Sequence, residues 1–483
     1  MPMNPSTTMP TTPPAGSRLL APWARALAAL LAVMMLALLA GGCATVRISE
    51  APSRQAQDPA MAQAAALAAG HAALEGQARA DNARAIQRLL AGLDDATLAR
   101  GAAALPPGDP LYDFAGRALL SRGLPLPRPF DAGGTWQFDA TARAPAEADG
   151  YQPPRKLAFL LPLSGNLARA AAPVRDGFLA GYYGETRTRP DISFYDTAAA
   201  GPVAAYQRAV AEGNDFVVGP LGRDEVASVF SSGALGVPML ALNRGRDTPP
   251  QGHASFSLSP EDEGIAAAEY LLQRNARRVL VIIGPDDSMR RAATAFGQRL
   301  VERGGAVTDT LYAGEDATAL APQLQAAARV EGGVDAVFLA VRGSRAHGLA
   351  PQLSLAGLAG TPRVATSQLT VGTGDAAEDR VLDGIVFPTE TWSVRGLPGL
   401  PSAASLGARL PTAEGQAARL FAFGYDAWLI TAYPGVAAGN REGGLRGATG
   451  MLAIDGFGNV LRTPTWSTFS GGVPVPLRDG LGG

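Results

Sequence analysis

From Lys156 onward, short apolar runs alternate with longer amphipathic stretches, and this alternation limits the fold more than any other feature of the sequence. The first four runs have the length and composition of buried strands: residues 156–163, 192–196, 215–220 and 237–242. The stretches between them read as amphipathic helices that end at glycine. Strand and helix alternating in this way predict a parallel sheet covered by helices on both faces. The sequence therefore predicts an α/β lobe.

A second lobe of the same kind follows the first. Its expected strands are residues 277–285, 306–312, 334–341, 361–367 and 383–388, with one helix over 289–303 and a late helix over 417–433 that completes this lobe. Later segments are expected to cross back and close the structure. Two such lobes imply a cleft between them. The predicted fold class is α/β, with two doubly wound lobes preceded by a short α-helical region.

The part of the chain before Lys156 divides into three segments. Residues 59–120 read as helix, with apolar residues at three- and four-residue spacings and with Asp81 and Asp94 as expected N-caps. A proline-rich stretch follows, with Pro125, Pro127, Pro129, Pro145, Pro153 and Pro154. We therefore expect a signal peptide over 1–42, a short helical N-terminal region over 43–123, a proline-rich linker over 124–154 and the two-lobed domain over 155–483.

Cys43 is the only cysteine of the 483 residues, so no internal disulfide can form. An apolar run over 26–40 precedes it and is too short to span a membrane as a helix, which is typical of a signal peptide. The small residues over 40–42 and the cysteine resemble the bacterial lipobox. This resemblance implies acylation of Cys43, and Ala44 implies the outer membrane, with the chain facing the periplasm. The alternative is an ordinary secretory signal followed by an incidental buried cysteine.

Charge and motif content exclude several function classes. The 41 basic and 43 acidic residues nearly balance, so no overall field favours nucleic acid. His71, His253 and His347 stand at no metal-ligating spacing, and the sequence has neither a P-loop nor a nucleophile elbow. Residues 371–377 fit a dinucleotide fingerprint, but no good buried strand precedes them, which favours a glycine-rich loop. We expect no catalytic residue, no metal and no cofactor, and therefore not an enzyme.

The order of motifs after Lys156 resembles that of a known family. The segments "RKLAFLLPLSGNLARAAAPVRDGFLAGYY", "ISFYDT", "DFVVGPLGRDEV", "VPMLALN" and "FSLSPEDEG" follow one another as in the type I periplasmic-binding-protein fold, and "DGIVFPTETW", "AFGYDAW" and "IDGFGNVLRTPTWSTFSGG" extend the match. More narrowly, the chain resembles the LppC/LpoA-like outer-membrane lipoproteins that activate penicillin-binding proteins, the peptidoglycan synthases. The resemblance implies a non-catalytic protein that docks on a bifunctional penicillin-binding protein and stimulates it. Familiar members carry a larger helical domain before the two lobes.

The same resemblance suggests residues for a ligand site in the cleft. Ser164 and Gly165 follow the first strand, where solute-binding relatives hold a ligand carboxylate with a hydroxyl group and helix-end amides. Gly219, with Pro220, and Asn243 follow later strands of the same lobe, at the edge where cleft ligands lie. Ordinary turn chemistry is the alternative explanation for these residues.

Two further side chains have open roles. Asp426 lies in the late helix, and its carboxylate fits either a role in the cleft or a buried structural hydrogen bond. Trp392 is a candidate docking residue, because tryptophan is enriched at protein interfaces.

Two functions from different classes fit these observations. The first is a lipid-anchored regulator that contacts a penicillin-binding protein. The second is a lipid-anchored receptor that binds an amino acid or similar small molecule for an ABC transporter, since fold alone does not determine function. A receptor needs several polar groups that converge in the cleft, and this requirement distinguishes the two functions.

Overall fold

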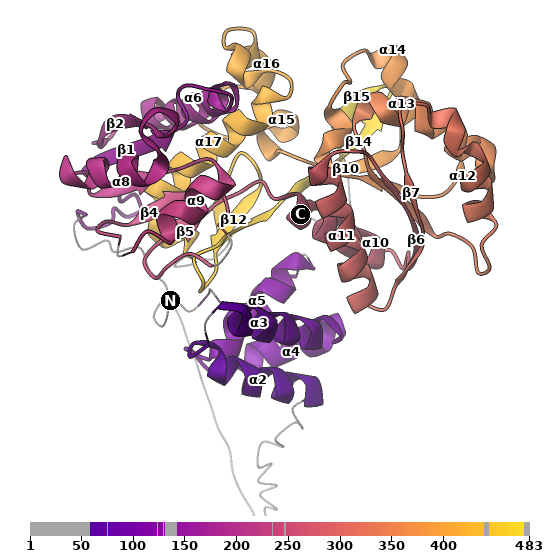
Figure 1. Ribbon diagram of the computed structural model, residues 1–483, viewed down its shortest axis with the longest axis horizontal. Helices are drawn as coiled ribbons and strands as arrows, with labels where there is room; N and C mark the ends of the chain where they lie inside the picture. Colours follow the sequence, from indigo (N-terminus) through magenta and orange to yellow (C-terminus); the bar gives the residue numbers. More distant parts are fainter. Residues whose placement is uncertain are drawn as a thin grey trace, which may run out of the picture. The chain divides into compact units, whose positions relative to one another are not determined.

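The computed structural model describes residues 58–477 except 75, 123, 129, 131–142, 234, 246–247 and 439–443. Figure 1 shows a group of helices, two α/β lobes and a small third sheet. Cys43 and the signal peptide expected over 1–42 lie outside the described residues. The predicted fold class, two doubly wound α/β lobes preceded by helices, is confirmed.

Four helices precede the first strand: α2 (Pro59–His71), α3 (Gly76–Ala91), α4 (Asp95–Ala104) and α5 (Pro110–Ser121). Aspartates cap three of them, because Asp58, Asp94 and Asp109 each accept a hydrogen bond from a first-turn amide. The expected cap at Asp94 is confirmed, whereas Asp81 lies inside α3 and is not a cap. The four helices, called the helical region below, bury an apolar core of their own that includes Ile86, Leu98, Leu111 and Tyr112.

Lobe 1 is built on a parallel sheet in the order β2-β1-β3-β4-β5. Its strands are β1 (Lys156–Leu161), β2 (Asp191–Asp196), β3 (Phe216–Val218), β4 (Met239–Ala241) and β5 (Ala254–Ser255). Its helices are α6 (Ala168–Gly184), α7 (Thr197–Ala200), α8 (Pro202–Ala211) and α9 (Arg223–Phe230). Along β1, Leu157 and Phe159 pack into one core while Ala158 and Leu160 pack into another. The strand is therefore buried on both faces, as the continuous apolar run predicts.

Lobe 2 contains a larger sheet in the order β15-β14-β10-β9-β8-β6-β7. Its parallel strands are β6 (Arg278–Ile283), β7 (Ala306–Tyr312), β8 (Ala336–Ala340), β9 (Arg363–Ala365) and β10 (Ile385–Thr389). Two antiparallel strands complete it: β14 (Thr465–Ser470) and β15 (Val473–Pro476). The main helices are α10 (Pro260–Leu272), α11 (Asp287–Glu302), α12 (Ala321–Ala328) and α13 (Gly343–Leu353), and α14 (Ala376–Asp379) is a single turn.

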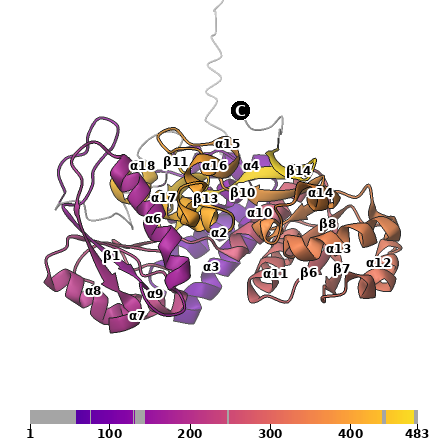
Figure 2. The same cartoon turned by 90° about the horizontal axis from the view of Figure 1, so that it is seen from above.

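The late helix, α17 (Ala417–Ala432), belongs to lobe 1 and not to lobe 2 as the sequence order suggested. It lies side by side with α6 in both views (Figures 1 and 2). Glycines allow this close approach, because a Cβ added at Gly177 would overlap the carbonyl oxygen of Phe421 and one added at Gly424 would overlap that of Val174. The assignment of this helix to lobe 2 was wrong because the sequence of an apolar helix does not indicate which sheet it covers.

The chain crosses between the lobes beside this helix pair. It passes to lobe 2 between β5 and α10, returns between β10 and α17 through α15 (Thr391–Arg395) and α16 (Ala403–Gly407), and passes again to lobe 2 ahead of β14. After α17 come α18 (Pro434–Ala437) and an antiparallel sheet of β11 (Leu445–Arg446), β12 (Met451–Ile454) and β13 (Val460–Thr463). The expectation that later segments cross back is confirmed.

Candidate functional site

The first two predicted cleft residues lie at the carboxyl end of β1. The Ser164 hydroxyl donates a hydrogen bond of 2.7 Å to Asp196 at the end of β2, and the same carboxylate accepts a bond from the Leu163 amide. Gly165 is exposed and adopts a φ of +72°, which glycine tolerates without strain. Ser164 therefore has a protein partner from the neighbouring strand. Ligand binding at this turn stays a prediction.

The structure brings Gly219, Pro220 and Asn243 together at the carboxyl ends of β3 and β4. The Asn243 amide donates to the Leu221 carbonyl oxygen at 3.0 Å, and its side-chain oxygen accepts from the Arg244 amide at 2.9 Å. Gly219 has a φ of +99°, and a Cβ there would overlap the Leu160 carbonyl oxygen. These contacts tie the two loops to each other. A ligand role for the three residues also stays a prediction.

Asp426 is fully buried in α17. Its carboxylate accepts hydrogen bonds from the amides of Ala448 and Thr449 and from the Thr449 hydroxyl at 2.6 Å. Burial raises the pKa of Asp426 to about 7, although the Thr449 and Ala448 hydrogen bonds act in the opposite direction. The side chain therefore holds the loop between β11 and β12 against α17, and a cleft role for it stays a prediction.

Between the lobes the structure places four charged side chains that the sequence did not single out: Glu263, Glu390, Arg419 and Arg462. We call them the interlobe charge cluster. Glu263, in the first turn of α10, accepts hydrogen bonds from the Ser367 amide and hydroxyl, both at 2.9 Å. Arg419 of α17 contacts Glu263 and lies 3.3 Å from Glu390, and Arg462 of β13 lies 3.9 Å from Glu263. The cluster thus joins lobe 1, lobe 2 and the third sheet.

The interlobe charge cluster contains two carboxylates and two guanidinium groups. Glu263 is only 3% exposed, so its ionised form needs partners. Burial raises the pKa of Glu263, but the charges of Arg419 and Arg462 and the hydrogen bonds from Ser367 outweigh burial, and the pKa lies below its usual value. Arg462 also donates to the Thr449 carbonyl oxygen at 3.2 Å, which connects the cluster to Asp426. The opposite charges neutralise one another inside the protein.

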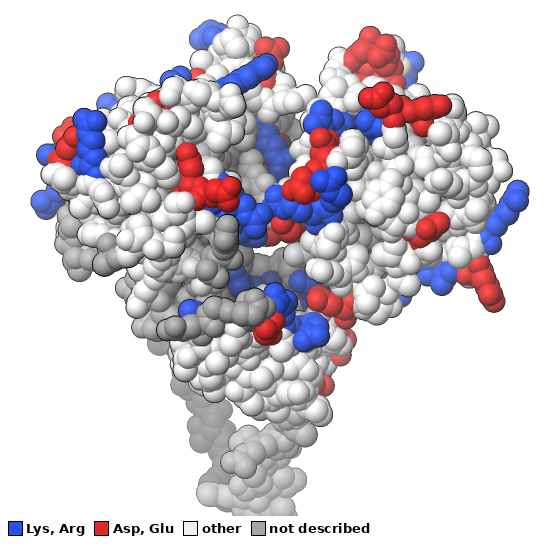
Figure 3. All heavy atoms as spheres, in the orientation of Figure 1, with Lys and Arg blue, Asp and Glu red and all other residues white. Residues whose placement is uncertain are grey.

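Two further ion pairs lie at the start of α10. Arg244, after β4 of lobe 1, forms a bidentate ion pair with Asp262, with N···O distances of 2.9 and 2.7 Å. Arg291 of α11 forms a bidentate ion pair with Glu261, with distances of 2.7 and 2.8 Å. Such paired geometry is stronger than a single contact. Figure 3 shows positive and negative side chains next to one another across the space between the lobes. Glu261 and Asp262, at the start of α10, thus each have an arginine partner.

Sequence reasoning missed these residues for identifiable reasons. Glu261, Asp262 and Glu263 read as first-turn acidic residues behind the Ser259 cap, a role that explains them without any distant partner. Arg419 reads as one polar residue of an apolar helix. The one available signal was that a charge in so apolar a helix needs a counter-charge.

The other residues considered from the sequence have structural surroundings. Trp392 is buried, stacks on Phe421 and donates to the Pro401 carbonyl oxygen at 2.8 Å, so the expectation of a docking role is wrong. His71, His253 and His347 lie in the helical region, lobe 1 and lobe 2. In the described part of the chain no group of three or more His, Cys, Asp or Glu side chains is arranged to hold a metal ion. Residues 371–377 follow the 3-10 turn Ser367–Thr370, where the fingerprint needs a strand.

Comparison with known proteins gives one family and several relatives. The family model described as "LppC putative lipoprotein" matches residues 150–472. Penicillin-binding protein activator LpoA from Photobacterium profundum is 27% identical over 355 residues, which cover 67% of this chain and 57% of the relative. The chain thus spans little more than half the length of that curated relative.

Similar solved structures include the following two. Full-length LpoA from Haemophilus influenzae superposes with a TM-score of 0.59 at 20% identity, over 87% of this chain and 74% of that chain. A protein from Chromobacterium violaceum described as a "putative branched-chain amino acid ABC transporter" superposes with a TM-score of 0.52 at 28% identity, over 65% of this chain and 100% of that chain. Among the described residues, no helix combines the length and apolar character that crossing a bilayer requires.

Proposed function

Because the chain belongs to the LppC lipoprotein family, we propose that it binds and activates a penicillin-binding protein and so regulates peptidoglycan synthesis. The observation that carries this proposal is the family match, which runs through both lobes from residue 150 to residue 472. The Photobacterium profundum relative is named a penicillin-binding protein activator. The partner that we propose is a bifunctional penicillin-binding protein, and the chain acts as a regulator and not as an enzyme.

The geometry between the lobes supports a regulator over a solute receptor. A receptor needs polar groups that converge on a ligand and that are satisfied by it. Here Arg419 pairs with Glu263, Arg244 pairs with Asp262, and the Ser164 hydroxyl donates to Asp196. Polar groups that already form ion pairs or hydrogen bonds with one another gain little free energy by binding a solute.

We further propose that acylated Cys43 anchors the chain in the outer membrane, facing the periplasm. Each buried methylene contributes about 0.8 kcal/mol, so two or more acyl chains hold a protein on a membrane firmly. The synthase is then contacted from that surface.

A reconstituted reaction tests the regulatory proposal. A purified bifunctional penicillin-binding protein is supplied with lipid-linked precursor, and glycan polymerisation and peptide cross-linking are measured with and without the full acylated chain in detergent. We expect at least one of the two rates to rise and to saturate with added chain. Rates that stay unchanged when the chain is in large excess would contradict the proposal.

Membrane fractionation tests the anchor separately. Cells that express the native chain and cells that express Cys43→Ala are separated into inner membrane, outer membrane and soluble fractions. We expect only the native chain in the outer membrane. The same distribution for both proteins would rule out acylation of Cys43 as the anchor and would leave the activation result unaffected.

The second candidate function is a lipid-anchored receptor for an amino acid or similar solute. The similarity to the Chromobacterium violaceum protein favours it, as do Ser164, Gly165, Gly219 and Asn243 at the sheet edge. A thermal-shift screen with amino acids tests it, because a ligand at 100 times its Kd stabilises a protein by about 2.7 kcal/mol. A hit that Asn243→Ala abolishes would support the receptor, and a screen without any hit would remove it.

A further inference from the structure

In the described part of the chain, the helical region contacts the rest of the molecule at two places that differ in packing. The first is the hairpin of β12 and β13. Phe457 at its turn packs edge-on against Phe114 of α5, with ring centroids 4.9 Å apart, and against His71 of α2. Arg117 of α5 lies over the Phe457 ring at 5.0 Å and pairs with Asp455. Aromatic contacts and the ion pair of a buried carboxylate make this a closely packed attachment.

The hairpin packs on the core of lobe 1. Leu452, Ile454 and Val460 lie in the core cluster that also contains Phe159 and Phe256 of that lobe. The Ser255 amide at the end of β5 donates to the Gly458 carbonyl oxygen at 2.8 Å. A helical region fixed to the hairpin therefore moves with lobe 1.

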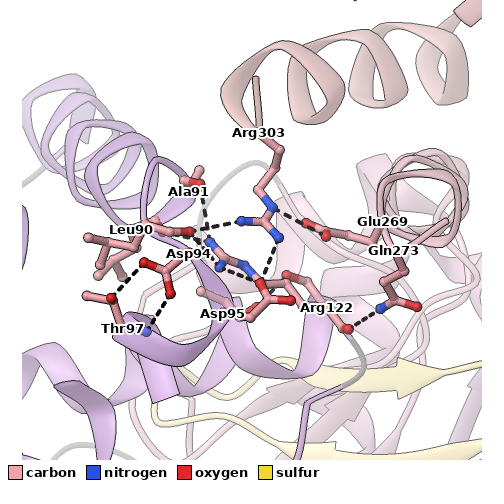
Figure 4. Close-up of polar contacts among 12 residues, drawn as sticks. Leu90, Ala91, Asp94, Asp95, Thr97, Arg122, Glu269, Gln273 and Arg303 are labelled. Atoms are coloured by element: carbon pink, nitrogen blue, oxygen red, sulfur yellow. Dashed lines mark hydrogen bonds and ion pairs between the residues drawn. The ribbon is translucent and has the colours of Figure 1, made fainter. Parts of the chain in front are cut away.

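The second contact is with lobe 2 and is polar (Figure 4). Arg303, which follows α11, donates to the Leu93 carbonyl oxygen at 2.9 Å and to the Asp95 carboxylate at 2.7 Å. Gln273, which follows α10, donates to the Arg122 carbonyl oxygen. Behind these bonds, Glu269 lies 3.5 Å from the Arg303 guanidinium and 3.4 Å from that of Arg299. These hydrogen bonds and ion pairs join the helical region to lobe 2 through long polar side chains, without close apolar packing.

The seam between the helical region and lobe 2 borders a cavity. This cavity of about 790 Å³ lies where the helical region meets both lobes and the β12–β13 hairpin, since its lining includes Phe114, Asn243, Tyr270 and Leu461. The Asp95 side chain is 43% exposed, so water and salt reach the Arg303 pair. An ion pair that water and salt reach is weaker than one that they do not reach. The lobe 2 attachment is therefore the weaker of the two.

From these two attachments we infer that the helical region is a brace across the interlobe hinge, held permanently by lobe 1 and releasably by lobe 2. While Arg303 and Gln273 hold it, the angle between the lobes is restricted. When they release it, the helices stay with lobe 1, and lobe 2 turns on the crossover segments about the interlobe charge cluster, which still joins the two lobes. This inference does not rest on the identity of the partner proposed above.

Distance measurements between pairs of spin labels test the brace. The full chain carrying Cys43→Ala has no native thiol to compete with introduced labels. Exposed positions supply the labels: Gln63→Cys on α2, Gln207→Cys on α8 of lobe 1 and Gln325→Cys on α12 of lobe 2. The three pairwise distances then report how the helical region and the two lobes lie relative to one another.

In the otherwise unchanged chain we expect all three distance distributions to be narrow. With Arg303→Gln and Gln273→Ala together, the distances from lobe 2 to lobe 1 and from lobe 2 to the helical region should both broaden, while that from the helical region to lobe 1 stays narrow. Arg290→Gln is the matched control, because Arg290 lies on α11 and its side chain bonds to Pro285 and Asp287 of its own lobe. It should leave all three distributions unchanged.

Two results would overturn the inference. If the distance between the lobes stays narrow while lobe 2 separates from the helical region, the helices do not restrict the hinge. If the helical region instead separates from lobe 1, the hairpin is not the permanent attachment. Both results are distinct from failure of the synthase assay, which measures another property of the chain.

Discussion

Arg419 on α17 of lobe 1 lies directly against the buried carboxylate of Glu263 on α10 of lobe 2. The two residues are 156 positions apart in the chain and lie on helices of different lobes. Their contact places opposite charges where the two lobes meet. Within lobe 2, the Glu263 carboxylate accepts hydrogen bonds from Ser367. Arg419 of lobe 1 adds a positive charge beside it.

Arg419→Gln should destabilise the protein strongly. Removing one partner of a buried ion pair typically costs about 3–5 kcal/mol, because the other charge stays buried without compensation. Arg462, at 3.9 Å, compensates Glu263 only in part. Urea unfolding followed by circular dichroism measures the loss of unfolding free energy.

Arg409→Gln is the control for this substitution. Arg409 is exposed, so the change should stay within about 0.5 kcal/mol. Adding Glu263→Gln to Arg419→Gln should recover part of the loss, because the uncompensated charge is then gone. A loss below about 1 kcal/mol for Arg419→Gln would show that Glu263 does not depend on this arginine.

Gly177→Ala should disrupt the contact of α6 with α17. The new methyl group would overlap the Phe421 carbonyl oxygen, and a backbone atom cannot turn aside as a side chain can. Overpacking of this kind costs about 1–3 kcal/mol and sometimes more. The shift in the thermal unfolding midpoint measures it.

Gly184→Ala, at the end of the same helix, is the matched comparison. No atom lies within 4 Å of a Cβ at Gly184, and the residue is exposed. Replacing an exposed helical glycine by alanine stabilises by up to about 1 kcal/mol. Equal effects of the two substitutions would show that the close helix contact is absent in solution.

Most of the parallel strands could be predicted from sequence because each depends on a local pattern. The run over 306–312 became β7 with the same bounds, and the apolar run from Lys156 became β1. Burial on both faces leaves a continuous apolar signal that needs no knowledge of the partner strands. The two lobes were therefore readable from their own segments.

The features that join the lobes could not be predicted, because each depends on a distant partner. Nothing near Arg419 indicates Glu263, and nothing in α17 indicates that its partner is α6, although glycines of both helices make the contact close. The antiparallel strands β14 and β15 complete the lobe 2 sheet from the far end of the chain. Of the predicted cleft residues, Gly219 and Asn243 did come together, because both follow neighbouring parallel strands of one sheet.

His253 should make the stability of the protein depend on pH between about 4 and 6.5. Burial lowers the pKa of His253 to about 4, whereas the usual pKa of a histidine, as in the unfolded chain, is 6.5. As the pH falls through this window, His253 binds a proton in the unfolded chain but not in the folded chain. Stability is therefore fully present above pH 6.5 and declines as the pH falls toward 4.

Urea unfolding of the native chain and of His253→Gln at a series of pH values isolates this contribution. The native chain should lose up to about 1.4 kcal/mol per pH unit more than the variant within the window, which corresponds to one proton. Above pH 7.5 the two proteins should depend on pH identically, because neither folded nor unfolded His253 carries the proton there. Parallel curves through the whole range would mean that folded His253 accepts its proton at the ordinary pH.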